Sequence, residues 1–421
     1  MNILRRIAVF GLWGEQNLAF DVHRDINFLI GENGTGKTTV INLIAAILTA
    51  DIPTLSRLSF SNASLELVDP ETDSPSTIAV SKEQDDISAP LVEYAITAGR
   101  SESVKYRLPQ TTNTRFLSSL GTRNPTFLTH RLSLTDHLTR LLNVRWLSVN
   151  RAEATQARED RSGDPDVDRK LDQLGTELTK LFSALTKLSE AETIAFQRVV
   201  FASLLHQESF SSILDNIKEI DIERERSILH QIFSTFKIPA SDGYSAKIDY
   251  HFEMLRRALD QVARSEGVEA NEIGAIIAVP RLQIVIKEWN AMVTRQEQIQ
   301  RPTTLFLKIL NDLFRRKTAR VNDRNELVLS SDSGRQLNLK DLSSGEKQLI
   351  IILGEALLQG NARCIYIADE PEISLHVAWQ EHLVTNLRRL NSNSQLLFAT
   401  HSPDIVSSYD DRVLQMEAII G

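Results

Sequence analysis

Residues 26–42 read INFLIGENGTGKTTVIN, and this stretch decides the fold. It has the glycine, lysine and threonine spacing of a phosphate-binding loop, with a short apolar run before it and an apolar, helix-compatible run after it. Glycines lack Cβ, so successive backbone N–H groups can converge on a polyphosphate, and the positive end of the next helix points at the same place. We expect Lys37 to reach the β- and γ-phosphates and the Thr38 hydroxyl to hold Mg²⁺. The loop residues are Gly31, Glu32, Asn33, Gly34, Thr35, Gly36, Lys37, Thr38 and Thr39.

Composition describes a globular chain long enough for two or three packed units. It has 421 residues, of which 42% are hydrophobic and 24% charged. A net charge of -8 argues against non-specific nucleic-acid binding by the whole surface, while it leaves room for a local basic groove. The single cysteine, Cys364, excludes an intramolecular disulfide and a cysteine-based zinc site, and its apolar neighbours predict burial. No signal peptide or long apolar run is present, so we expect a cytoplasmic protein without a membrane span.

The regions around the loop predict strands and one buried helix. Strands are expected at 3–10 and 18–30, and a helix at 40–48 ends at Asp51-Ile52-Pro53. Short β-rich pieces between 58 and 108, separated by turns, predict an antiparallel β layer beside the loop, and another strand is expected at 144–149.

The middle of the chain predicts a mostly helical insertion. Polar residues 156–168 suit an exposed linker, and leucines then recur at 171, 174, 178, 181, 185 and 188. Intervals of three and four fit either a short coiled-coil seam or an amphipathic helix packed on its own domain, and Gly175 is expected to interrupt this helix. Further helices are expected within 194–235, 246–264 and 282–299, with breaks at Pro239, Gly267 and Pro280. After Pro302, a helix at 303–314 and a strand at 326–330 follow.

The last third of the chain carries polar residues at the ends of apolar segments. Ser343-Ser344-Gly345-Glu346 precedes an apolar helix at 349–358; taken alone, it is equally an N-cap with an acidic first turn. The strand 365–368 ends in Asp369, suited to hold a metal's hydration shell, and Glu370, suited to orient or deprotonate a water. The strand 395–399 leads to His401, which follows the other parts in the order expected of a γ-phosphate sensor.

Together these motifs resemble the ABC-type ATPases. The resemblance rests on the phosphate loop, Leu-Ser-Ser-Gly-Glu, Ile-Tyr-Ile-Ala-Asp-Glu-Pro, Ser-Leu-His and Ala-Thr-His-Ser-Pro. Within that superfamily the chain is most similar to the SMC, RecF and OLD-like group, and Phe-Gly-Leu-Trp-Gly before the loop resembles stand-alone ATPases of bacterial anti-phage defence systems of the PARIS or Septu kind. The resemblance implies an α/β ATPase head, with a mixed sheet and an antiparallel β lobe, interrupted by a helical insertion with a short coiled-coil-like hairpin. The implied domains are 1–154, 155–302 and 303–421, the middle one being the insertion.

The resemblance also implies an active site divided between two subunits, with ATP and Mg²⁺ as cofactors. Residues 31–39 of one subunit hold ATP, and Ser343, Ser344, Gly345 and Glu346 of another close on its γ-phosphate, where the helix presents a positive N-terminus. Thr38 and Asp369 serve the metal, and Glu370, His401 and Lys37 are the catalytic residues. Ser374 falls where the family has its subunit-crossing loop.

The chain departs from the family pattern after Val149. The family places a metal-reaching glutamine there, whereas this sequence has Asn150 and Arg151. Either Gln156 acts from an unusual offset, or one of those two residues substitutes.

Three classes of function follow. The favoured one is an ATP-driven switch and scaffold that oligomerises around ATP and controls a separate effector, a nuclease or toxin, in anti-phage defence. The alternative is a RecF-like or SMC-like repair ATPase that binds DNA on the closed dimer. A transporter motor ranks last because the insertion is too long, and the chain after His401 is too short for the nuclease domain of OLD-like proteins. A DNA clamp predicts a basic face on the insertion, from Arg256, Arg257, Arg264, Arg281, Lys287, Arg315, Arg316 and Lys317, although a solvated helix face explains these residues equally.

Overall fold

The structure is a computed structural model that describes residues 1–83, 91–99, 102–109, 125–147, 166–209, 213, 220–239, 243–264 and 266–420. The chain forms two compact units. The first, called here the head unit, comprises Met1–Leu181 and Pro302–Gly421, and the second, the helical unit, comprises Phe182–Arg301. The predicted domain boundary at 154 and 155 lies outside the described residues.

A five-stranded parallel sheet positions the phosphate loop. Its order is β14 (Val413–Gln415), β3 (Ile26–Ile30), β13 (Ser394–Ala399), β12 (Cys364–Asp369) and β8 (Val144–Trp146). Strands β12 and β13 are apolar and buried, as expected for a parallel sheet covered on both faces. Because the strands are parallel and in close register, the carboxyl ends of β3, β12 and β13 meet at one edge.

An antiparallel sheet of six strands shares its core with the loop helix. Its order is β2 (Gln16–Asp21), β1 (Ile3–Leu12), β4 (Asn62–Val68), β5 (Pro75–Glu83), β6 (Leu91–Ala98) and β7 (Val104–Pro109). One cluster of buried apolar side chains joins this sheet to α1 (Lys37–Thr49), α2 (Ile52–Arg57) and α4 (Pro125–Leu141). Burial of that shared core fixes the loop between the two sheets.

The remaining parts of the head unit complete the expected α/β fold class. A small antiparallel sheet contains β9 (Lys317–Val321), β10 (Leu327–Ser331) and β11 (Gln336–Leu337). Helices α10 (Ser344–Leu358) and α11 (Val377–Leu390) alternate with β12 and β13, and the short α12 (Pro403–Val406) and α13 (Met416–Ile419) follow. The combination of a parallel sheet, an antiparallel β lobe and a helical insertion confirms the predicted fold class.

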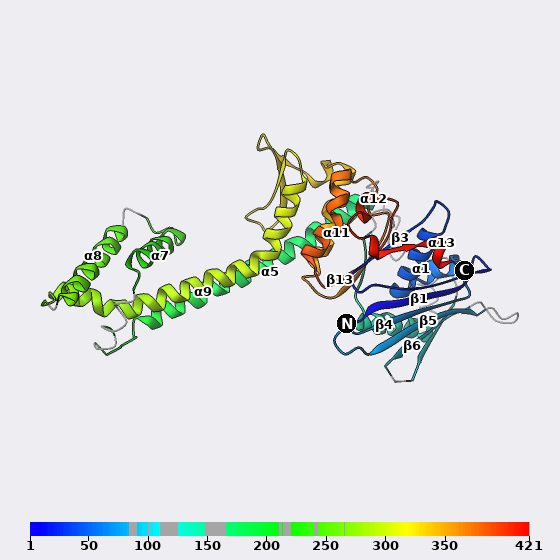
Figure 1. The fold of residues 1–421 in the computed structure, drawn as a ribbon, viewed down its shortest axis with the longest axis horizontal. Helices are drawn as coiled ribbons and strands as arrows, with labels where there is room; N and C mark the ends of the chain where they lie inside the picture. Colours follow the sequence, from blue (N-terminus) through cyan, green and yellow to red (C-terminus); the bar gives the residue numbers. More distant parts are fainter. Residues whose placement is uncertain are drawn as a thin grey trace. The chain divides into compact units, whose positions relative to one another are not determined.

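The helical unit is built on two long helices. Helix α5 (Asp166–Ser203) and helix α9 (Ala270–Leu313) lie side by side (Figure 1), where Gln296 Nε2 donates to the Ser189 carbonyl at 2.9 Å. Helices α7 (Ile222–Thr235) and α8 (Tyr244–Ala263) add a second apolar cluster that includes Phe196, Leu255 and Trp289. In the described part of the chain, no helix is both long and apolar enough to span a bilayer.

Several expectations about the insertion are wrong. Helix α5 continues through Gly175, and α9 continues through Pro280, so neither residue interrupts its helix. The 303–314 helix is the last part of α9, which also passes through Pro302. A long helix packed along its length can absorb the local cost of glycine or proline, which single-sequence patterns do not reveal.

The leucine series follows two different patterns along α5. Leu171, Leu174 and Leu178 are buried in the head unit, whereas Leu188 is 54% exposed. Leu174 lies against Gly354 of α10. The first half of the series is therefore the apolar face of a helix packed on its own domain, which was one of the two interpretations.

The predicted strand at 18–30 is also wrong as a single element. It divides into β2, which pairs with β1 in the antiparallel sheet, and β3, which joins the parallel sheet. Between them, the Asn27 side chain accepts from His23 N–H at 2.7 Å and donates to the His23 carbonyl at 2.9 Å. The chain changes sheets at this turn, and the continuous apolar pattern hides the change.

Candidate functional site

The phosphate loop joins the end of β3 to the start of α1. Gly34 and Gly36 adopt φ angles of +89° and +92°, which L side chains rarely reach, and Gly36 is the N-cap of α1. The Lys37 side chain folds back over the loop, so that Nζ donates to the carbonyl oxygens of Gly31 at 2.8 Å and Glu32 at 2.9 Å. The loop thus gathers backbone N–H groups and one buried cation at the N-terminus of a helix.

The other predicted loop residues lie in the same turn. Glu32, Asn33 and Gly34 are exposed, and Thr35 Oγ1 donates to the Glu32 carbonyl at 2.9 Å. Thr38 is exposed and Thr39 half-buried in the first turn of α1.

Two residues that the sequence did not reveal also contact the loop. Glu417, on α13, accepts from Glu32 N–H at 2.7 Å, and this bond lowers the pKa of its carboxyl. The ring of Trp13 covers Gly36 so closely that a Cβ there would lie 2.0 Å from it. No local pattern could identify Glu417, because it is far from the loop in sequence and comes near only through the pairing of β14 with β3.

An oxygen pair suited to Mg²⁺ stands beside the loop. Thr38 Oγ1 donates to Asp369 Oδ1 at 3.2 Å, which brings together the two predicted metal ligands from α1 and β12. Two neighbouring ligands of an octahedral Mg²⁺ lie about 3 Å apart, and Mg²⁺ takes one or two protein oxygens together with phosphates and waters. The pair therefore fits this ion. In the described residues, no group of three or more His, Cys, Asp or Glu side chains is arranged to hold a metal.

Glu370 and His401 face each other at the carboxyl ends of β12 and β13. His401 Nε2 lies 3.6 Å from Glu370 Oε1, and both side chains are about one-third exposed, at 38% and 34%. Glu370 adopts a left-handed φ of +47° while its N–H donates to the Ala399 carbonyl at 2.8 Å. A non-glycine residue held in this conformation at a strand end is a feature often found at functional sites. At this separation one water molecule can lie within hydrogen-bonding distance of both side chains.

Ser343 and Glu346 form a capping box at the N-terminus of α10. Ser343 Oγ accepts from Glu346 N–H at 3.4 Å, and Glu346 Oε2 accepts from Ser343 N–H at 2.9 Å. Burial acts to raise the pKa of Glu346, but the 2.6 Å bond from Lys317 Nζ and the bonds from Ser343 outweigh it, so the pKa is lowered. The N-cap interpretation is thus confirmed, and it leaves Ser344 and Gly345 at the positive end of a long helix.

The structure brings some predicted residues together and leaves others apart. Lys37, Thr38, Asp369, Glu370 and His401 gather around the edge of the parallel sheet. In the described part of the chain, no hydrogen bond joins 343–346 to the loop at 31–39. Asn150, Arg151 and Gln156 lie outside the described residues.

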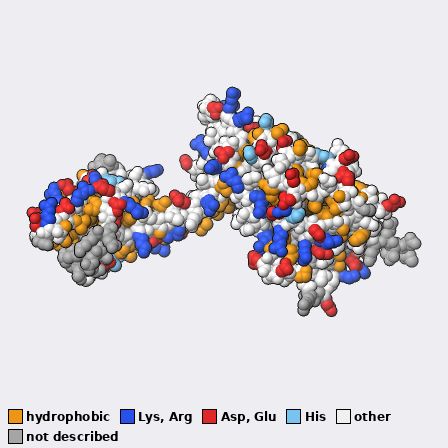
Figure 2. Space-filling model, in the orientation of Figure 1, with side chains coloured by type: hydrophobic (Ala, Val, Ile, Leu, Met, Phe, Trp, Pro, Cys, Tyr) orange, Lys and Arg blue, Asp and Glu red, His pale blue; other side chains and the backbone are white. Residues whose placement is uncertain are grey.

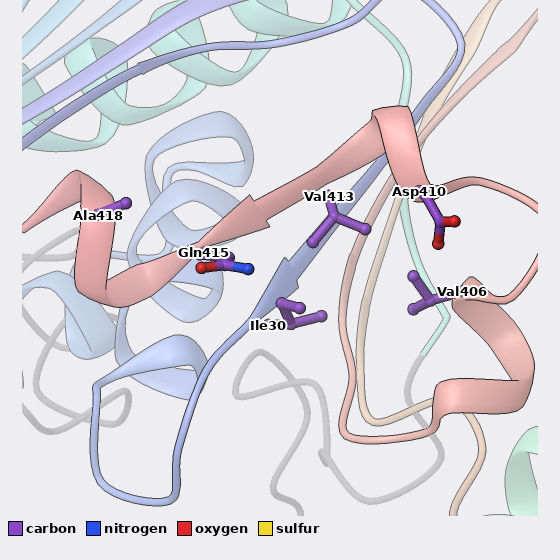
Figure 3. Close-up of a pocket in the computed structure, with 6 residues that line it drawn as sticks. All are labelled: Ile30, Val406, Asp410, Val413, Gln415 and Ala418. Atoms are coloured by element: carbon purple, nitrogen blue, oxygen red, sulfur yellow. The ribbon is translucent and has the colours of Figure 1, made fainter.

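A pocket of about 480 Å³ lies beside β3 and adjoins the loop, because its lining includes Ile30, which directly precedes Gly31 (Figure 3). Its lining comes from β3, β14 and the segments next to them, namely Ile30, Val406, Asp410, Val413, Gln415 and Ala418. Asp410 is the sole ionisable residue among these six, and a carboxylate repels a polyphosphate. The phosphate-binding chemistry therefore belongs to the loop and not to this pocket.

Comparison with known proteins points to the same chemistry. A family model described as "AAA domain" matches residues 6–233, more than half of the chain, and a second, described as "AAA domain, putative AbiEii toxin, Type IV TA system", matches 209–407. A retron Vc95 probable ATPase from Vibrio cholerae serotype O1 biovar El Tor is 27% identical over 128 residues, which cover 28% of this chain and 24% of that protein. A retron Ec83 probable ATPase from Escherichia coli is 28% identical over 87 residues, or 18% and 16% of the two chains. The matched stretches thus span a quarter or less of these relatives.

Among solved structures, similar chains include Smc head domains with coiled coils. One from Pyrococcus furiosus, bound to the C-terminal domain of ScpA, has a TM-score of 0.43 at 12% identity and covers 97% of this chain and 92% of its own. Another, from Pyrococcus yayanosii, has a TM-score of 0.39 at 14% identity and covers 99% and 95%. The AAA domain model matches the sequence over more than half of the chain, and the chain therefore belongs to the AAA domain family.

Proposed function

We propose that this protein binds and hydrolyses ATP with Mg²⁺ and works as an oligomeric switch that controls a separate effector, a nuclease or toxin, in anti-phage defence. The observation that carries the ATPase proposal is the oxygen pair of Thr38 and Asp369 beside the Lys37 loop, with Glu370 and His401 next to it. Lys37 and the loop N–H groups would bind the phosphates, and Thr38 and Asp369 would hold the metal. Bound Mg²⁺ supplies neutralisation of phosphate charge.

The roles of the other side chains follow from their positions. Glu370 would orient or deprotonate the attacking water, and His401 would contact that water and the γ-phosphate. Ser343, Ser344 and Gly345 would reach the nucleotide of a second copy, because the N-terminus of α10 attracts an anion and, among the described residues, makes no hydrogen bond to the loop at 31–39 of the same chain. The same proposal includes three further points. The protein oligomerises around ATP, and Ser374 is part of the contact between subunits. The chain divides into head and insertion at 154 and 302.

The defence role draws on the relatives. Two of them are retron probable ATPases, and one matching family model is described as a putative toxin of a toxin–antitoxin system. These similarities support an ATPase that serves a neighbouring effector.

Charge pairing on the helical unit favours this role over a DNA clamp. Arg256 pairs with Glu223, Arg257 with Glu253, and Arg295 with both Glu192 and Glu288. Figure 2 shows basic and acidic side chains interleaved over the visible face of this unit. An arginine already paired to a carboxylate contributes less to phosphate binding, which depends on unneutralised cations. The repair ATPase remains the second candidate.

Substitution of Lys37 by alanine tests the ATPase proposal. The loop loses its buried cation, so ATP affinity should fall by about a hundredfold, roughly 3 kcal/mol. Isothermal titration with Mg²⁺ and a slowly hydrolysed ATP analogue measures the affinity, and phosphate release measures turnover. Lys347→Ala is the matched control, because Lys347 is a similarly buried lysine that pairs with Asp168 away from the loop. An unchanged ATP affinity in Lys37→Ala would show that the loop is not the ATP-binding site.

The effector and DNA alternatives are separated by two assays on the wild type. Stable co-purification with the product of a neighbouring gene supports the switch, whereas salt-sensitive DNA binding with DNA-stimulated ATPase activity supports a repair enzyme.

A further inference from the structure

Glu372 holds the backbone that carries His401. One of its carboxylate oxygens, Oε1, accepts three hydrogen bonds: from Thr400 Oγ1 at 2.5 Å, from His401 N–H at 2.9 Å and from Ser402 N–H at 3.2 Å. Glu372 itself is 9% exposed, and Thr400 is fully buried. A single buried oxygen thus binds three consecutive residues of the segment between β13 and α12.

The same residue belongs to the turn that presents Glu370. In that turn Ile373 N–H donates to the Glu370 carbonyl at 3.1 Å, and Leu375 N–H donates to the Glu372 carbonyl at 2.9 Å. Glu370 and His401 come from different strands, and their side chains do not reach hydrogen-bonding distance of each other. Glu372 therefore ties the His401 segment to the Glu370 turn through its side chain, beside the bond from Glu370 N–H to the Ala399 carbonyl.

The second oxygen of Glu372 makes the arrangement unusual. Oε2 is buried, and no group in the described residues donates to it. A buried acceptor without a donor costs stability, and a neutral side chain would avoid that cost. The Glu372 side chain thus combines three hydrogen bonds at Oε1 with a buried Oε2 that has no donor among the described residues.

We propose that Glu372 is a positioning residue that sets the distance between His401 and Glu370 and so controls the hydrolytic step. This inference rests on the proposed ATPase function. The hydrogen bonds of the Glu372 side chain go to residues 400–402, and none in the described residues goes to the loop at 31–39, so we expect it to act on turnover through His401 and to leave nucleotide binding to Lys37 and Thr38. Gln380 also connects the two segments, because its Oε1 accepts from Ser402 Oγ at 2.6 Å and its Nε2 donates to the Leu375 carbonyl at 2.9 Å.

The first test measures amide exchange and does not depend on activity. In Glu372→Ala the amide hydrogen of His401 loses its acceptor, so its exchange should quicken by at least about tenfold, whereas Ser402 N–H keeps its bond to Thr400 Oγ1 at 3.0 Å and should change less. Glu93→Ala is the matched control, because Glu93 is also buried and binds Lys105 and Arg107 in the antiparallel sheet. Its loss should leave exchange at 400–402 unchanged. Equal exchange in the wild type and Glu372→Ala would overturn the proposal.

The second test is kinetic. Glu372→Ala should lower kcat by at least about tenfold with KM for ATP within about twofold, and Glu372→Gln, which keeps an acceptor oxygen, should recover most of the loss. In a His401→Ala background, Glu372→Ala should have no further effect, because both changes remove the same contribution. If the double variant loses kcat by the product of the two single losses, the two residues act independently, which would contradict the proposal. A wild type that neither binds nor hydrolyses ATP would defeat the proposed function and with it the hydrolytic role of Glu372, and the exchange test would still show whether Glu372 holds the backbone at His401.

Discussion

Gly345 leaves no room for a side chain at the start of α10. A Cβ at this position would lie 2.2 Å from the backbone oxygen of Ser374, and a backbone atom cannot rotate aside as the end of a long side chain can. Ser374 itself has a left-handed φ of +70°. Close packing alone therefore explains why this position is a glycine, without any nucleotide contact. The same contact brings together, within one chain, the two segments that are predicted to lie between subunits: the start of α10 and the turn at Ser374.

Gly345→Ala should lower the free energy of unfolding by about 1–3 kcal/mol, because the added methyl group overpacks this contact. Urea unfolding measures the change. Gly175→Ala is the matched control: Gly175 lies in the interior of α5 with open space around it, so alanine should raise the free energy of unfolding by up to about 1 kcal/mol. Changes of the same sign in both variants would show that the contact with Ser374 does not constrain α10.

At the scale of whole elements, local sequence predicted the strands and the helix around the candidate site well. The apolar runs before Gly31 and before Asp369 are strands β3 and β12, and the run after Lys37 is α1. Each of these signals is contained within a few adjacent residues, and burial on both faces of the sheet makes the runs continuous. The burial of Cys364 is confirmed as well, and it raises the pKa of the thiol to about 12.

The elements that sequence missed depend on distant partners. Strand β14 has three residues, and only its pairing with β3 makes it a strand. The contact of Glu417 with the loop and the three bonds of Glu372 are equally non-local. Pro280 and Pro302 predicted helix ends because proline lacks an N–H and crowds the preceding turn, yet packing along α9 outweighs that preference.

The two prolines of α9 give a prediction about this helix. Pro302 is exposed, so Pro302→Ala should restore a backbone hydrogen bond without loss of packing and raise the free energy of unfolding by up to about 3 kcal/mol. Pro280 is buried, and its replacement should give a smaller gain because the ring also loses its contacts. Urea unfolding of both variants measures the difference. A loss of stability in Pro302→Ala would mean that the helix depends on the proline.

At the scale of the whole molecule, the proposed site requires more than one chain. Glu370→Gln keeps the phosphate loop and the metal ligands but removes the group assigned to the water. This variant should bind ATP, fail to hydrolyse it, and accumulate as a larger assembly whose mass is measured by light scattering with MgATP. Lys37→Ala, whose ATP affinity should fall by about a hundredfold, is the control that stays small at an ATP concentration that saturates Glu370→Gln but not Lys37→Ala. Normal hydrolysis by Glu370→Gln would show that Glu370 does not activate the water. If the variant binds ATP but its mass equals that of the ATP-free protein, the result would argue against a site shared between two subunits.

The order of the strands in the parallel sheet bears on how the chain is synthesised. β3 emerges early from the ribosome, but both of its neighbours, β13 and β14, belong to the last part of the chain. The helical unit is a continuous segment made in between, so it can fold while the edges of β3 are still unpaired. Nascent chains therefore pass through a stage in which a finished helical unit coexists with an unfinished head, and that stage is when chaperones and aggregation compete for the protein.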